Sequence, residues 1–67
     1  MSALLWEDFR DAHNHFQCAA NSAQQAMFLA MAGKPAAAHH DFMQACLAKA
    51  ADRLGYRLVP VQGGSAA

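Results

Sequence analysis

The chain has 67 residues, and although 55% of them are apolar, seventeen are alanine, so few large side chains are available for a core. A domain of this size is marginally stable unless a disulfide, a metal, oligomerisation or very good helix packing supports it. The formal net charge is zero and the five basic residues are scattered, which argues against a surface that grips nucleic-acid phosphates.

The first predicted element is a helix from Ser2 or Leu4 to Ala32, which Ser2 can cap. Alanine favours helix, and apolar residues recur at alternating spacings of four and three, as in a coiled-coil heptad. This stripe consists of Leu5, Phe9, Ala12, Phe16, Ala19, Ala23, Ala26 and Ala30, flanked by Trp6, His13, Ala20 and Met27. Asn21 and Ser22 are weak helix formers, so the pattern also allows a bend between them.

Gly33-Lys34-Pro35 divides the chain, and a second helix is predicted from Pro35 to Leu54. Glycine just past one helix and proline at the first position of the next are the usual asymmetry of helix ends. Gly55 marks the second stop. The stripe of the second helix consists of His39, Met43, Cys46 or Leu47, Ala50 and Leu54, widened by Phe42. A short connection makes the helices antiparallel, and a register centred on Lys34 places Cys18 beside Ala50.

The segment from Tyr56 to Val61 has strand character, although Pro60 would confine any strand to a sheet edge. We expect it to be a short extended segment that can fold back over part of the projecting start of helix one. The glycine-rich residues 63–67 read as a flexible tail, which leaves residues 1–62 as one helical-hairpin domain.

The predicted fold is mainly all-α: an antiparallel two-helix hairpin with an extended C-terminal segment. Two amphipathic helices leave one side of their core uncovered, so we expect a homodimer in a four-helix arrangement. The residues predicted for the core or dimer seam are Phe16, Ala19, Ala23, Met27, Met43, Cys46 and Leu54.

Five large apolar residues are predicted to bind a partner protein, because aromatic side chains are common at the energetic centres of interfaces and methionine adapts to varied surfaces. The alternative is that they pack in the core, near the turn or in the dimer interface. They are Leu5, Trp6, Phe9, Phe28 and Met31. The first three lie where the longer first helix projects beyond the second.

The histidines and cysteines form two groups, one around Cys18 and one around Cys46, but the expected register puts them at different levels of the hairpin. The tight paired spacings of structural zinc sites are absent, and a disulfide would require Cα atoms within about 7 Å. The chain has no catalytic triad, glycine-rich phosphate loop or supported carboxylate pair. We therefore predict no metal, no cofactor and no catalytic residue.

The run Leu54-Gly55-Tyr56-Arg57-Leu58-Val59 resembles the end of small helix-turn-helix repressors and antitoxins. In those proteins the last helix passes through a Leu-Gly step into a short strand. The resemblance covers only this stretch, and the preceding chain lacks a pair of short helices with a basic recognition face. It therefore assigns no residue a role.

These features favour a small cytoplasmic interaction protein: an adaptor, inhibitor or regulator that binds a larger protein, in the style of phage or mobile-element accessory proteins. The start of the chain lacks the basic and apolar regions of a signal peptide, and the thiols are expected to be reduced. One alternative is a dimeric nucleic-acid-binding regulator that uses Lys49, Arg53 and Arg57 as a basic patch. Another is a metal- or pH-responsive switch that uses the four histidines.

Overall fold

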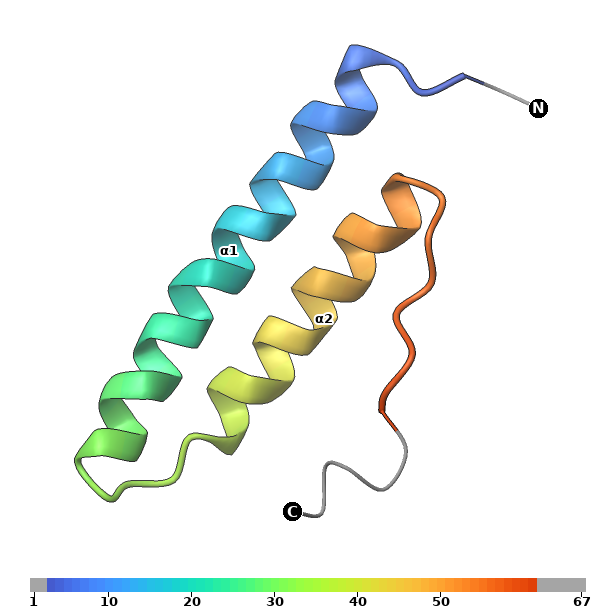
Figure 1. Cartoon of the computed structure of the whole chain (residues 1–67). Helices are drawn as coiled ribbons and strands as arrows, with labels where there is room; N and C mark the ends of the chain where they lie inside the picture. The colour runs from blue at the N-terminus through green and yellow to red at the C-terminus, as the bar shows by residue number, and fades with distance from the viewer. Residues whose placement is uncertain (1–2, 62–67) are drawn as a thin grey trace.

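Two antiparallel α-helices lie side by side in the computed structural model, which describes residues 3–61 (Figure 1). α1 spans Trp6–Met31 and α2 spans Ala37–Arg53. Residues 3–61 contain no strand, so the predicted all-helical hairpin is confirmed. The predicted cap Ser2 and the tail 63–67 lie outside the described residues.

α1 begins at Trp6, later than predicted, because its first turn is capped from within. The backbone N–H of Leu5 donates a hydrogen bond to Oδ2 of Asp8 at 2.8 Å. Glu7 and Asp8 also place negative charge in the first turn, where it favours the helix dipole. The helix then runs without interruption through Asn21 and Ser22.

Both helices end in the same hydrogen-bonded motif, built around a glycine with positive φ. Gly33 has φ +72° and Gly55 has φ +87°, values that a residue with a Cβ rarely adopts. In each case the next amide reaches back along the helix: Lys34 N–H to Leu29 O at 2.8 Å, and Tyr56 N–H to Ala51 O at 2.7 Å. These are Schellman motifs, and they confirm the two predicted stops.

The prediction that α2 starts at Pro35 is wrong by two residues, since the helix begins at Ala37. Lys34 turns back onto Leu29, and residues 35 and 36 carry the chain from that turn to the start of α2. α2 consequently begins well inside the end of α1, and α1 extends beyond α2 at both ends (Figure 1).

Small side chains form the contact between the helices. The buried residues among those described are Ala12, Ala19, Ser22, Cys46 and Ala50. Ala12 keeps 2% of its surface exposed and Ala50 keeps none. Residues this small let the helix backbones approach closely, but they bury little apolar area, so the contact contributes little hydrophobic stabilisation.

The predicted stripe of α1 is split by the structure. Its members Ala12, Ala19 and Ala26 face α2, where they alternate with half-buried or buried His15, Ser22 and Leu29. The larger members Phe9 and Phe16 are exposed, together with Leu5, Ala23 and Ala30. A phenylalanine does not fit where two helices meet through alanines, so the bulky half of the stripe lies along the margin of the contact.

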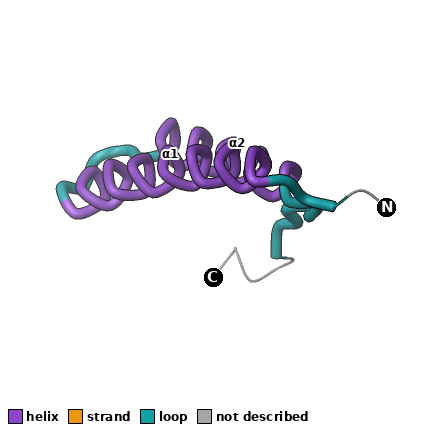
Figure 2. Tube along the Cα trace, turned by 90° about the horizontal axis from the view of Figure 1, so that it is seen from above, coloured by secondary structure: helices purple, strands orange, loops and turns teal. Residues whose placement is uncertain are grey.

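The hairpin is one helix layer thick, with Cα extents of 46 × 26 × 12 Å (Figure 2). The extended residues 56–61 run back along α2 on the side away from α1, so the expectation that they cover the start of α1 is wrong (Figure 1). The Schellman turn at Gly55 reverses the chain beside α2 and directs it there. Tyr56, Arg57 and Leu58 line a shallow pocket with residues of the outer side of α2.

Candidate protein-binding surface

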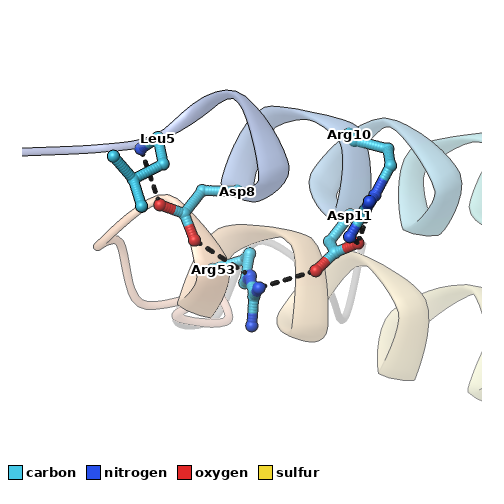
Figure 3. A network of polar contacts seen from close by, with 5 residues as sticks. All are labelled: Leu5, Asp8, Arg10, Asp11 and Arg53. Atoms are coloured by element: carbon cyan, nitrogen blue, oxygen red, sulfur yellow. Dashed lines mark hydrogen bonds and ion pairs between the residues drawn. The ribbon is translucent and has the colours of Figure 1, made fainter.

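An ion-pair cluster fixes how the two helices align (Figure 3). Arg53 at the end of α2 contacts two carboxylates of α1, with Nε 3.2 Å from Oδ1 of Asp8 and Nη2 2.6 Å from Oδ2 of Asp11. Asp8 also accepts a hydrogen bond from the backbone N–H of Leu5, and Nη2 of Arg10 lies 3.0 Å from Oδ1 of Asp11. One arginine therefore joins the start of α1 to the end of α2.

This alignment differs from the predicted register. A register centred on Lys34 places Arg53 opposite His15, whereas Arg53 lies against Asp8 and Asp11, one to two turns earlier on α1. Cys18 correspondingly shares a groove with Phe42 rather than lying beside Ala50. The non-helical residues 35 and 36 account for the shift, because they carry the chain back toward the start of α1 before α2 begins.

Most large apolar side chains lie outside the contact between the helices, whereas Leu29, Met43, Leu47 and Leu54 are half-buried at it. Within the described part of the chain, no large side chain is fully buried. The exposed large apolar residues are Leu4, Leu5, Trp6, Phe9, Phe16, Met27, Phe28, Met31, Phe42, Tyr56, Leu58, Val59 and Val61. A 67-residue chain that exposes this many large apolar side chains and buries mainly alanine encloses little hydrophobic core of its own.

Helix geometry sorts the helical residues onto two opposite faces of the flat hairpin. Successive residues turn by about 100°, so the residues to one side of the buried seam form what we call the apolar face. It consists of Phe9, Phe16, Ala23 and Met27 of α1 with His40, Met43, Leu47 and Ala51 of α2, and the cap residues Leu5 and Leu54 extend it. The opposite face, which we call the polar face, carries Glu7, Asp11, Asn14, Cys18, Asn21, Gln25, Phe42, Lys49 and Arg53.

The five residues predicted to bind a partner are all exposed, and they gather at the two ends of α1. Leu5, Trp6 and Phe9 lie at its start, near or beyond the end of α2, and Phe28 and Met31 lie at the opposite end. Trp6 is 68% exposed and Met31 is 76% exposed. The guanidinium of Arg10 lies 5.1 Å from the centre of the Trp6 ring, which holds the indole against the first turns of α1.

The predicted seam residues are divided by the structure. Ala19 and Cys46 are buried between the helices, and Met43 and Leu54 are half-buried at the edge of that contact. Their partners in the prediction, Phe16, Ala23 and Met27, lie outside the contact and remain exposed. The residues buried between the helices and the exposed residues beside them are thus adjacent sets, with Met43 and Leu54 at the boundary.

A groove on the polar face was not anticipated from the sequence. It is lined by Cys18, Asn21, Ser22, Gln25, Ala38, His39 and Phe42, which come from the middle of α1 and the start of α2. These residues meet only because of the observed register, and no local sequence pattern connects them. The groove is open, and although Asn21 and Gln25 contribute amides, its lining surface is mostly apolar.

The histidines and cysteines do not assemble around a common point in the described structure. Within residues 3–61, no three side chains of His, Cys, Asp and Glu come close enough to share a metal ion. Cys18 is exposed and Cys46 is buried, and both thiols are free. We found no helix in the described region with an apolar stretch long enough to cross a bilayer.

Comparisons with known proteins give no relative from which to transfer a function. No protein-family model, no curated protein and no solved structure matches the chain. The functional interpretation therefore depends on the surface chemistry of the hairpin itself.

Proposed function

We propose that the chain is a non-enzymatic protein-interaction module: an adaptor, inhibitor or regulator that self-associates and binds a larger protein. One observation carries the proposal, namely that the large apolar side chains lie on the surface while the helix contact is built from small ones. Exposed apolar surface of this extent is typical of protein-binding sites. A cytoplasmic setting, in which thiols stay reduced, is part of the proposal.

The larger protein is proposed to bind at the ends of α1. Trp6, Phe28 and Met31 point away from the seam with α2, so covering the apolar face with another helix layer leaves room for a partner there. Tryptophan is among the residues that contribute most to binding energy at protein interfaces. A larger host protein bound by a phage or mobile-element accessory protein is the kind of partner we favour.

The nucleic-acid alternative loses support from the ion pairs. Its basic patch requires Lys49, Arg53 and Arg57 to face phosphates together. Arg53 instead contacts both Asp8 and Asp11, whose carboxylates offset its charge. Two remaining cations per chain form a weak electrostatic surface for a polyanion.

Photo-crosslinking at two matched positions tests the binding of a larger protein. Benzoylphenylalanine replaces Trp6 in one variant and Gln17 in the other, three turns further along the same outer edge of α1. In extract from the native host, we expect the Trp6 position to give one discrete adduct with a larger protein. Excess unmodified chain should compete it away, and the Gln17 position should not form it.

If both positions give the same diffuse adducts, or if unmodified chain does not compete, the start of α1 is not a specific docking site. Mass spectrometry of the adduct identifies the partner in the favourable case.

A further inference from the structure

We infer that the central part of the apolar face is covered by a second copy of this chain, packed face to face across a two-fold axis. The inference deepens the proposed self-association by naming the surface and its occupant. It is independent of the larger protein, which is proposed to bind at the ends of α1.

The first support is the distribution of charge. The charged residues of the two described helices lie on the polar face, at the outer edges or at the seam, and none lies on the apolar face. His40 lies on this face near the start of α2, in one helical row with Leu47 and Ala51, and Gln44 lies at its margin. A copy can therefore meet a copy across the apolar face without placing like carboxylate, ammonium or guanidinium charges against each other, a repulsion that any two-fold interface otherwise risks.

The second support is the area available. α1 has 26 residues and α2 has 17, so at 1.5 Å per residue and about 10 Å per helix they project a face of roughly 650 Å² before its relief is counted. A stable protein interface buries about 800 Å² of accessible surface on each partner, so a second copy has to cover most of this face. The chain is one helix layer thick, and domains ordinarily need two layers to enclose a core.

The third support is the position of the bulky residues within the face. Because Arg53 lies between Asp8 and Asp11, six residues back along α2 brings Leu47 to the level of Phe16. Both are near the middle of their helices. A two-fold axis that lies in the interface plane at the level of this pair thus brings Phe16 and Leu47 against the second copy.

The groove on the polar face offers the competing arrangement, and it supplies a matched control. Phe16 on the apolar face and Phe42 in the groove are the same residue type, both central, and 44% and 55% exposed in one chain. Their intrinsic reactivity toward hydroxyl radicals is equal, so any large difference in labelling reports which face is covered.

Hydroxyl-radical footprinting of the unmodified chain tests the inference, with mass measured by light scattering on the same sample. If an interface buries Phe16, which is 44% exposed in one chain, its labelling should slow several-fold relative to Phe42. Dilution below the dissociation constant should abolish the difference. Slower labelling of Phe42 than of Phe16 in a dimer overturns the inference and assigns the second copy to the groove.

Two variants test the same point by substitution. Phe16→Glu should convert the dimer to a monomer or an unfolded chain, and Phe42→Glu should leave the dimer mass unchanged. If the unmodified chain is a monomer at high concentration, self-association itself is wrong. If it is a dimer that Phe42→Glu dissociates and Phe16→Glu does not, self-association stands and the assigned face is wrong.

Discussion

At the scale of single residues, Arg53 is the residue whose ion pairs join the two helices. It contacts two carboxylates from a helix that begins 47 positions earlier in the chain, and those carboxylates also bind the Leu5 amide and Arg10. Such a cluster holds the end of α2 beside the start of α1 and so places Trp6 and Phe9. No local pattern in the sequence indicates it, because the partners are distant and their distance depends on the helix register.

Removing the arginine charge should destabilise the hairpin modestly. The side chains involved keep between 23% and 46% of their surface exposed, so water screens the pairs and Arg53→Met should cost about 1 kcal/mol of unfolding free energy. Chemical denaturation at low salt measures the loss, which should shrink at high salt. Lys49→Met is the control, since Lys49 forms no ion pair with the described residues. Equal effects of the two substitutions would contradict the proposed role of the cluster.

A second residue-scale prediction concerns the glycine after α1. A Cβ on Gly33 would meet no atom within 4 Å, so the cost of Gly33→Ala comes from the backbone, whose φ of +72° is unfavourable for alanine. We expect a loss of about 1 kcal/mol, and Gly33→Asn should lose less because asparagine tolerates this conformation better. Thermal denaturation of the two variants checks the order. Equal stability of Gly33→Ala and the parent chain would contradict the assigned turn.

At the scale of the helices, the sequence predicts where elements end better than it predicts which side they bury. The stops at Gly33 and Gly55 were predictable because a Schellman motif depends on one glycine and its neighbours. The buried side of α1 was not. Positions 15 and 16 differ by one residue within the same heptad pattern, and only contact with α2 decides that His15 faces inward and Phe16 outward.

The alanine seam gives a prediction at this scale. Ala50 is fully buried where the helices approach, so Ala50→Leu should force them apart and cost about 1–3 kcal/mol, as overpacking of a close contact does. Ala45→Leu, on an exposed position of α2, should change stability by less than about 0.5 kcal/mol. Urea denaturation of both variants compares them. A tolerated leucine at position 50 would show that the seam is looser than described.

At the scale of the whole molecule, the surface of the hairpin exposes an unusual number of large apolar side chains for a single chain of this size. Its exposed large apolar residues surround a helix contact that buries mainly alanine, and a single layer cannot enclose Phe16, Met27 or Leu47. Composition and helix count predicted a second layer, which the proposed dimer would supply. They did not predict which face is left uncovered, because the pattern grouped Phe16, Ala23 and Met27 with Ala19 and Cys46 in one core or dimer seam.

Coupling between folding and self-association should make the melting temperature depend on protein concentration. When two chains fold as one unit, each tenfold rise in concentration favours the folded dimer by about 1.4 kcal/mol, which corresponds to several degrees for a unit of this size. Calorimetry across a hundredfold range of concentration measures the slope for the parent chain and for Phe16→Glu and Phe42→Glu. We expect the parent and Phe42→Glu to share one slope and Phe16→Glu to have none. A concentration-independent melting temperature in the parent would mean that the single helix layer is stable alone, with its phenylalanines in water.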